Sequence, residues 1–306
     1  MVEPKILATG LRFPEGPVAM ADGSVALVEI ARGRISRVGA SGAITTIATP
    51  GGGPNGLAIG PDGAFYCCNN GGFGWIDDGK ILRTGYQPDD YTGGRIERID
   101  QASGAVSLLY DACDGRKLRG PNDLVFDAHG GFYFTDLGKN RPHERDHGGV
   151  YYARADGSRI VEVAHPVLTP NGIGLSPDGQ TLYVAETETS RLWAFDIEEP
   201  GKVAKQPWPS PHGGRLVVGL PGYQRFDSLA VTAAGNICVA TLVSGAITVA
   251  SPGGDVLSQV KLPDPMTTNL CFGGPDLHTA YVTLSGTGRL AVLDWPEPGL
   301  KLAHTR

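Results

Sequence analysis

Six polar residues occupy the same place in six similar stretches of the chain. Two are carboxylates and four are amides, and they are Glu15, Asn55, Asn122, Asn171, Asp227 and Asn269. Each of these side chains can offer a carboxylate or amide oxygen as a metal ligand, and none is a histidine or cysteine. Oxygen ligands of this kind are preferred by hard divalent cations. Grouped at one point, such side chains would be costly to bury without a partner. The pattern predicts a cation site, with Ca²⁺ ahead of Mg²⁺, Mn²⁺ and Zn²⁺. The alternative is that the asparagines cap turns.

A repeated unit must bring these residues together. In each stretch the polar residue precedes a short apolar strand, a turn such as Asp22-Gly23 or Asp178-Gly179, and a second β-rich strand. The apolar pattern has period two, and no segment sustains a helical period. Six units of about four strands predict an all-β fold, a six-bladed β-propeller, in one domain over residues 1–306. A short strand around residues 5–9 is expected to complete the last blade.

The predicted propeller explains why the six polar residues matter. Each one leads into the innermost strand of its blade, and the innermost strands line the central channel. We therefore expect a ring of six side chains near one mouth of the channel. Glu15, which stands between Pro14 and Gly16, is accordingly predicted to be a metal ligand and not a turn residue.

The composition of the chain limits the classes of molecule that it could bind. The 306 residues carry a net charge of −6, with no basic run and no long apolar stretch, which argues against nucleic acids and membranes as partners. The first residues lack the basic and apolar segments of a signal peptide, so a cytoplasmic location is expected. The five cysteines are predicted to be free thiols. The oligomeric state is left open.

Several motifs resemble one known family. FPEGPV (13–18), GPNDLVFD (120–127), GGFYFTD (130–136) and TPNGIGLSPDG (169–179) occur in the order found in the SMP-30/gluconolactonase family, and the similarity extends to about residue 283. The resemblance implies a six-bladed propeller that hydrolyses a small lactone with one divalent metal ion in its channel.

The resemblance also implies roles for individual residues. The metal ligands would be Glu15, Asn171 and Asp227, and Asp227 would also serve as the general base. Asn122 would contact the substrate and approach the metal, as part of the catalytic site, and Asn55 would be a further pocket residue. Arg119 is the nearest arginine that could contact substrate hydroxyl groups. Either Asp227 or the metal itself would activate the attacking water.

Other interpretations of the sequence remain open. A phosphotriesterase-like hydrolase, or a calcium-binding or ligand-binding propeller without activity, would use the same ring. No GxSxG motif supports a serine hydrolase, and the pair His143 and His147 is interpreted as part of a polar loop. The long insert at 71–94 is expected to form a lid or wall over the channel mouth, with Trp75, Tyr86 and Tyr91 available for packing on substrate, or else an ordinary surface loop.

Overall fold

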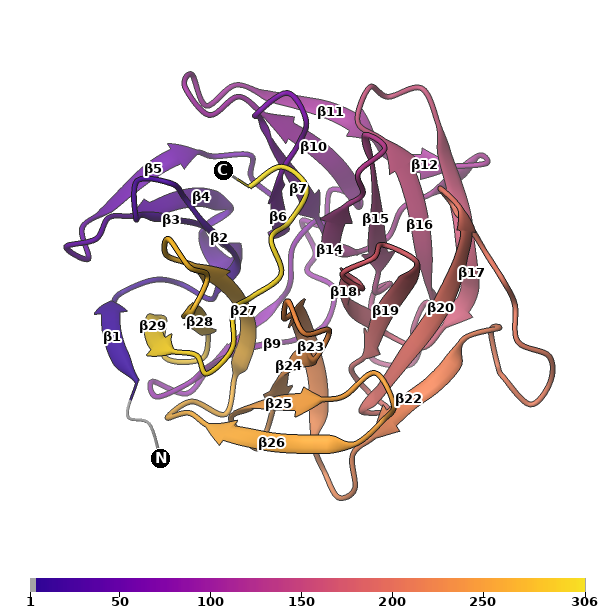
Figure 1. Cartoon of the computed structure of the whole chain (residues 1–306). Helices are drawn as coiled ribbons and strands as arrows, with labels where there is room; N and C mark the ends of the chain where they lie inside the picture. The colour runs from indigo at the N-terminus through magenta and orange to yellow at the C-terminus, as the bar shows by residue number, and fades with distance from the viewer. Residues whose placement is uncertain (1–3, 306) are drawn as a thin grey trace.

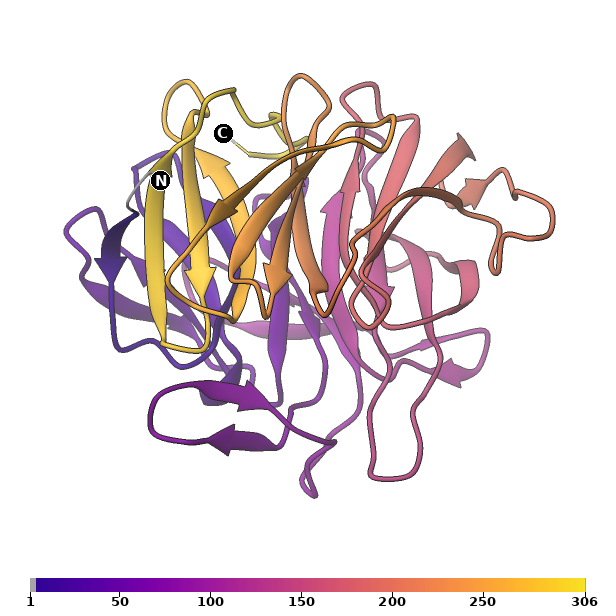
Figure 2. The same cartoon turned by 90° about the horizontal axis from the view of Figure 1, so that it is seen from below.

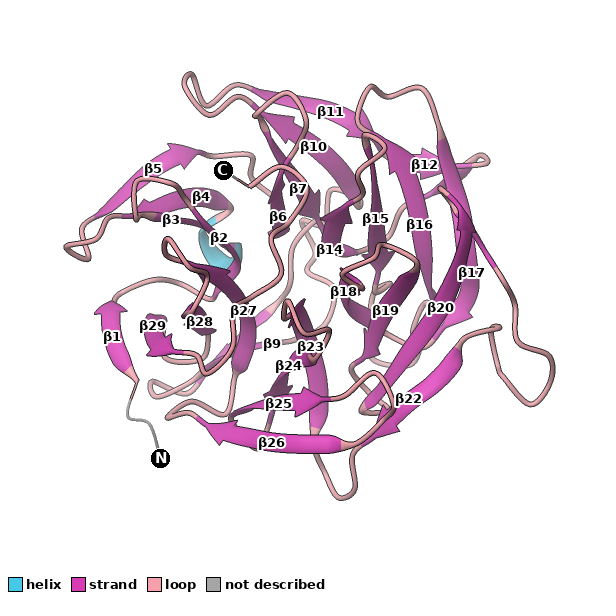
Figure 3. Ribbon diagram, viewed as in Figure 1, coloured by secondary structure: helices cyan, strands magenta, loops and turns pink. Residues whose placement is uncertain are grey.

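The protein is built almost entirely of strands. The computed structural model describes residues 4–305, in which six sheets surround a central channel (Figure 1). The one helical segment of these residues is a short 3₁₀ turn, η1 (Ile30–Arg32), drawn in cyan in Figure 3. The predicted six-bladed β-propeller is thus confirmed. Over the same residues, no helix has the length and apolar character needed to cross a membrane.

The first three blades follow one another along the chain, each starting at the channel. Blade 1 contains β2 (Pro14–Ala19), β3 (Val25–Glu29), β4 (Arg34–Val38) and β5 (Ile44–Ala48). Blade 2 contains β6 (Pro54–Ile59), β7 (Phe65–Asn69), β10 (Arg95–Ile99) and β11 (Val106–Tyr110). Blade 3 contains β14 (Pro121–Phe126), β15 (Gly131–Asp136), β16 (Gly148–Arg154) and β17 (Ile160–Val167). Two small hairpins lie outside the blades, β8 (Trp75–Asp77) with β9 (Leu82–Thr84) and β12 (Ala112–Cys113) with β13 (Arg116–Lys117).

The last three blades complete the ring. Blade 4 contains β18 (Pro170–Leu175), β19 (Thr181–Glu186), β20 (Arg191–Glu199), β21 (Lys202–Val203) and β22 (Arg215–Gly219). Blade 5 contains β23 (Arg225–Val231), β24 (Ile237–Leu242), β25 (Ala246–Ala250) and β26 (Val256–Lys261). Blade 6 contains β27 (Thr267–Gly273), β28 (Thr279–Leu284), β29 (Arg289–Asp294) and, as its outer strand, β1 (Lys5–Ala8).

The N-terminal strand closes the propeller. Strand β1 pairs antiparallel with β29, with Lys5 opposite Val292, so the first and last parts of the chain share one sheet, as the sequence predicted. This pairing covers the edge of the last blade, and it fastens the ring.

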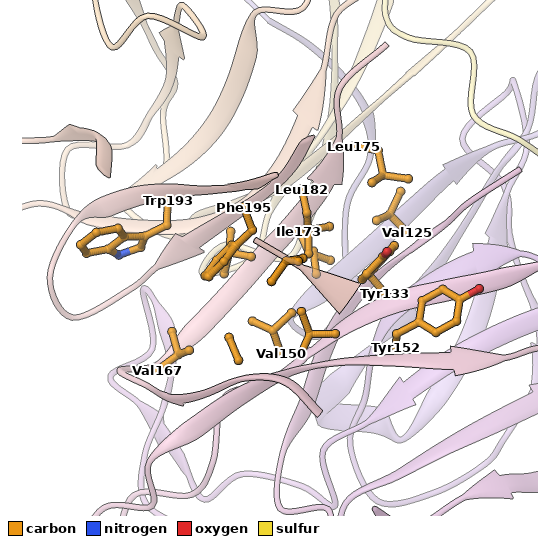
Figure 4. Close-up of a cluster of buried hydrophobic side chains, with 14 residues drawn as sticks. Val125, Tyr133, Val150, Tyr152, Val167, Ile173, Leu175, Leu182, Trp193 and Phe195 are labelled. Atoms are coloured by element: carbon orange, nitrogen blue, oxygen red, sulfur yellow. The ribbon is translucent and has the colours of Figure 1, made fainter. Parts of the chain in front are cut away.

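The core lies between neighbouring blades. Val125 and Val150 of blade 3, for example, pack with Ile173, Leu182 and Phe195 of blade 4 (Figure 4). Alternate residues of each strand face opposite neighbours, so every blade is apolar on both faces. The five cysteines are free, as predicted, and four of them are buried in this core. The resulting packing holds the inner strands, and hence the polar ring, in fixed positions.

Candidate metal and active site

Each innermost strand is irregular where its polar ring residue sits. The pairing register between inner strand and neighbour shifts between Glu15 and Val18 in blade 1 and between Pro54 and Leu57 in blade 2. Blades 3 to 5 show the same interruption at the corresponding place, and in blade 6 the shift comes just before Asn269. Such a bulge re-aims side chains and allows two consecutive residues to face the same side. The ring is therefore a repeated local feature of all six blades.

Glycines let the inner strands approach closely at this level. A Cβ atom on Gly16 would lie 2.5 Å from the Asn55 carbonyl oxygen of the next blade, and one on Gly172 would lie 2.6 Å from the Asp227 carbonyl oxygen. Gly16 also has a φ of +49°, a conformation that favours glycine. These contacts narrow the channel, so side chains from non-adjacent blades reach one another across it.

Hydrogen bonds link the ring residues of neighbouring blades. The Asn269 side-chain amide donates to Glu15 Oε2 at 2.8 Å, and the backbone N–H of Gly16 donates to the same oxygen at 3.0 Å. On the other side of the channel, the Ser228 hydroxyl lies 3.5 Å from Asn171 Oδ1. The Asn171 side-chain amide donates to the Thr187 hydroxyl oxygen at 3.0 Å. Glu15 and Asn171 are thus fixed by groups around them.

The ring contains three buried carboxyl groups, those of Glu15, Asp123 and Asp227. Burial raises the pKa of Asp123 to about 7, and the negative charge of Glu15 contributes to the rise. Burial also raises the pKa of Asp227, and the charge of Glu15 raises it further. Burial likewise raises the pKa of Glu15, although hydrogen bonds from neighbouring groups oppose this. The negative charge of Glu15 thus raises the pKa of both aspartates, and no positive group is among the causes that act on them.

The donor set fits a hard divalent cation. In the described part of the chain, no lysine, arginine or histidine forms an ion pair with any of the three carboxyl groups. Buried acids without a positive partner are costly, and a cation among them would lower their pKa values. Over residues 4–305, no cluster of three or more histidine, cysteine or acidic side chains has ready-made ligand geometry, so amide oxygens such as that of Asn171 would have to complete the ligand set.

Of the other predicted site residues, Asn55 and Asn122 lie in the ring and Arg119 does not. Asn55 and Asn122 are buried in the ring. Their side chains have no hydrogen-bond partner among residues 4–305, so their amides are available to a ligand. Arg119 is exposed, and its backbone N–H donates to Asp136 at 2.7 Å. Among residues 4–305, Arg119 forms no hydrogen bond or ion pair with a ring residue. The structure therefore brings together Glu15, Asn171 and Asp227 but not Arg119.

Sequence reasoning missed Asp123 because it counted one polar residue for each blade. Asp123 follows Asn122 at the position that Gly16 and Gly172 hold in blades 1 and 4. The signal that could have revealed it is this replacement of a recurrent glycine by an acid. Ser228, next to Asp227, is the equivalent replacement in blade 5.

The insert at 71–94 crosses the face of the propeller on which the ring lies. Figure 2 shows its hairpin, in purple, on the face opposite the C-terminus. Trp75 packs against Phe13 of blade 1 with ring centroids 5.1 Å apart. The Leu82 N–H donates to the carbonyl oxygen of Gly286, beyond the end of β28 in blade 6, at 2.9 Å. The hairpin thus extends from blade 2 over blades 1 and 6.

The second half of the insert, after β9, contacts blade 3. The Tyr91 hydroxyl donates to the Arg119 carbonyl oxygen at 2.5 Å, and the Gln87 N–H donates to that of Asn140 at 2.8 Å. Trp75 and Tyr91 are therefore half-buried by contacts within the protein, whereas Tyr86 is exposed. The insert forms a wall on the side of blades 6, 1, 2 and 3, which leaves the side of blades 4 and 5 without this cover.

The histidine pair lies in an exposed loop. His143 and His147 are exposed in the loop between β15 and β16, which agrees with their interpretation as part of a polar loop.

Comparison with known proteins gives consistent results. A family model described as SMP-30/Gluconolactonase/LRE-like region matches residues 13–286. A Staphylococcus haemolyticus protein named Lactonase drp35 is 29% identical over 261 residues, which cover 85% of this chain and 72% of the relative. A Zymomonas mobilis protein named Gluconolactonase is 24% identical over 298 residues, covering 88% of this chain and 75% of the relative.

Solved structures share the fold. A putative gluconolactonase superposes with a TM-score of 0.75 at 24% identity, covering 98% of this chain and 94% of its own. A calcium-binding protein, regucalcin from Agrobacterium tumefaciens, superposes with a TM-score of 0.75 at 20% identity, covering 98% of both chains. At such identities the likeness concerns the fold alone.

Proposed function

Because this chain belongs to the SMP-30/gluconolactonase/LRE-like family, we propose that it hydrolyses a small lactone at a divalent cation held in the polar ring. The observation that carries the proposal is that three carboxyl groups, those of Glu15, Asp123 and Asp227, are buried in the ring together with its amides and have no positive partner among residues 4–305. Relatives named lactonase and gluconolactonase support the reaction class.

The proposed ligands are Glu15, Asn171 and Asp227, and Ca²⁺ is the preferred ion because the donors are all oxygen. When bound, the cation would act as a Lewis acid toward the lactone carbonyl group. The fixed hydrogen bonds of Glu15 and Asn171 would hold their oxygens in place, so little reorganisation would accompany binding.

We assign the proton transfers to Asp227. Its carboxylate would accept a proton from the water whose oxygen attacks the lactone carbonyl carbon. After the ring C–O bond breaks, the same proton would pass to the departing alkoxide oxygen. The side-chain amides of Asn122 and Asn55, which are free of recorded partners among the described residues, would hydrogen-bond the lactone and orient it. The wall formed by the insert would limit access of bulk water from one side.

The test uses purified full-length protein loaded with Ca²⁺. We expect turnover of glucono-δ-lactone and a fall of about a hundredfold to ten-thousandfold in kcat for Asp227→Asn. Asp178→Asn, at an exposed turn, is the matched control and should retain wild-type turnover. Near wild-type turnover by Asp227→Asn would remove this residue from the reaction.

Two alternatives give different outcomes in the same assay. Hydrolysis of a fluorophosphate without hydrolysis of any lactone would indicate a phosphotriesterase-like enzyme. Tight Ca²⁺ binding without turnover of either substrate class would indicate a binding protein.

A further inference from the structure

Three charged side chains from three blades meet at the rim of the channel. Arg145 belongs to the loop between β15 and β16 of blade 3, Glu188 follows β19 of blade 4, and Arg225 begins β23 of blade 5. Glu188 Oε1 lies 3.2 Å from Arg145 Nη1, and its Oε2 lies 3.1 Å from Arg225 Nη2. We call these three residues the rim triad. Two of them stand on the side of blades 4 and 5, which the insert leaves without cover.

The inner strand of blade 5 places Arg225 just outside the polar ring. Arg225 is two residues before Asp227 on β23, a separation of about 7 Å along an extended strand. In blade 1 the same position is held by Phe13, which packs against Trp75 of the insert. The position therefore lies on the insert face of the propeller, next to the proposed lactonase site.

The acid of the rim triad is tied to the ring through blade 4. The Glu188 backbone N–H donates to the Thr169 hydroxyl oxygen at 3.0 Å, and Thr169 is two residues before Asn171. The residue before Glu188, Thr187, accepts the hydrogen bond of the Asn171 side-chain amide at 3.0 Å. A molecule bound at the ring thus has the rim triad beside it.

The rim triad has one positive charge in excess. Its two arginines share a single acid, and neither forms an ion pair with another acid among residues 4–305. The side chains of Arg145 and Arg225 are 31% and 33% exposed. Nη1 of Arg225 has no hydrogen-bond partner among residues 4–305 and, unlike Nε, is not a buried atom. This nitrogen can therefore donate to a ligand that arrives from solvent.

The guanidinium group of Arg225 is held in place before any ligand binds. Glu188 contacts it on one side, and the Tyr223 ring centroid lies 5.4 Å from its Cζ atom. A planar guanidinium group of fixed orientation suits a carboxylate, to which it can donate two parallel hydrogen bonds. The single excess charge of the rim triad also matches a group with one negative charge.

We propose, as an extension that rests on the proposed lactonase function, that the rim triad selects lactones that carry a carboxylate group. The carboxylate binds Arg225 and Arg145 at the rim, while the lactone group reaches the polar ring. The three acids of the ring carry more negative charge than one divalent cation neutralises, which keeps the charged end of the substrate away from them. The rim triad thereby orients the substrate with its lactone carbonyl toward the ring.

The experiment compares two lactones that differ at one carbon atom. D-Glucaro-1,4-lactone has a carboxylate where D-glucono-1,4-lactone has a hydroxymethyl group. Initial rates of the Ca²⁺-loaded full chain give kcat/KM for each lactone. We expect the wild type to prefer the carboxylate lactone. Arg225→Gln should reduce this preference about tenfold to a hundredfold, mainly through KM, which is the loss expected for a hydrogen bond between charged groups.

Two further variants support the comparison. Arg145→Gln changes the rim triad from a different loop and should also reduce the preference, so the test does not depend on the folding of one variant. Arg98→Gln is the matched control, because Arg98 also pairs with a single acid, Asp62, at 2.6 Å. Asp62 lies in the turn after β6, at the end of blade 2 opposite the rim, so this variant should keep the wild-type preference. Melting curves show which variants are folded.

The outcomes separate this proposal from the proposed function. A wild type without preference for the carboxylate lactone would overturn the role of the rim triad, as would an unchanged preference in folded Arg225→Gln and Arg145→Gln. Turnover of neither lactone would count against the proposed function, and the two lactones are then compared by their Kd values in calorimetry. Tighter binding of the carboxylate lactone, lost in Arg225→Gln, would still support the rim triad, and equal Kd values would overturn it.

Discussion

Lys139 should make the stability of the protein rise with pH above neutrality. Its side chain is buried, and its ammonium group donates to the Gly72 carbonyl oxygen at 2.6 Å and lies 4.4 Å from the Phe73 ring centroid. In the described part of the chain it has no ion pair with an acid. Burial lowers the pKa of Lys139 from 10.5 to about 7, although Asp136 and Asp146 oppose this. The charged form is therefore disfavoured in the folded state.

The sign of the effect follows from the protons bound by each state. Between pH 7 and 10.5 the unfolded chain holds a proton on Lys139 that the folded chain has released, so the free energy of unfolding increases with pH in this window. The cost of burial is fully present below pH 7. One proton corresponds to a slope of at most about 1.4 kcal/mol per pH unit, and the gap between the two pKa values corresponds to about 5 kcal/mol as an upper bound.

The assay is urea unfolding of the wild type and of Lys139→Met at pH 7, 8, 9 and 10. The difference between the two proteins isolates Lys139 from other groups that titrate in this range, and it should grow with pH in favour of the wild type. Lys205→Met is the comparison, because Lys205 also donates to a backbone carbonyl, that of Val163 at 2.5 Å, but is an exposed residue. Burial lowers the pKa of Lys205 as well, so its effect should have the same sign and be smaller than that of Lys139→Met. Equal pH slopes in the wild type and Lys139→Met would refute the reasoning.

Two further predictions concern blade 1. Burial alone would raise the pKa of Glu29, but hydrogen bonds from Ser36, Arg34 and neighbouring groups lower it below 4.5. Glu29→Gln should therefore reduce the free energy of unfolding at pH 7 by about 2 kcal/mol, and the deficit should disappear as the pH falls through the folded pKa; an unchanged urea midpoint at pH 7 would contradict this. Gly16→Ala should destabilise by about 2 kcal/mol or more and weaken Ca²⁺ binding in calorimetry, because its Cβ would lie 2.5 Å from the Asn55 carbonyl oxygen. Gly23→Ala has a similar positive φ but open space around it, so it measures the backbone cost alone and should leave Ca²⁺ affinity intact; equal effects of both variants would disprove the close contact.

The fold could be predicted because its signals are local and repeated. Period-two patterns and turns such as Asp62-Gly63 recur in the sequence, and each unit alone indicates a hairpin. Aligning the units also identified Glu15 and Asp227 as ring residues. The insert at 71–94 was expected over the channel mouth, but the repeat does not describe its hairpin, β8 with β9, or its contacts with blades 6, 1 and 3.

The remaining site features depend on contacts that a sequence does not encode locally. Asp123 was missed because a bulge turns it toward the channel beside Asn122. Lys139 is buried only because the insert from blade 2 folds over it, with Gly72 and Phe73 in contact. Arg119 was placed near the substrate by its position in the chain, yet its backbone is tied to Asp136 and its side chain is exposed.

The most direct test of the proposed function is metal titration of lactone hydrolysis. Protein stripped of metal with a chelator is assayed on glucono-δ-lactone while Ca²⁺ is added in steps. We predict negligible turnover without metal and activity that rises to a plateau at one ion per chain. For Glu15→Gln, the plateau should be reached only at a much higher Ca²⁺ concentration. Full activity in the stripped protein, or the same Ca²⁺ dependence in the wild type and Glu15→Gln, would contradict it.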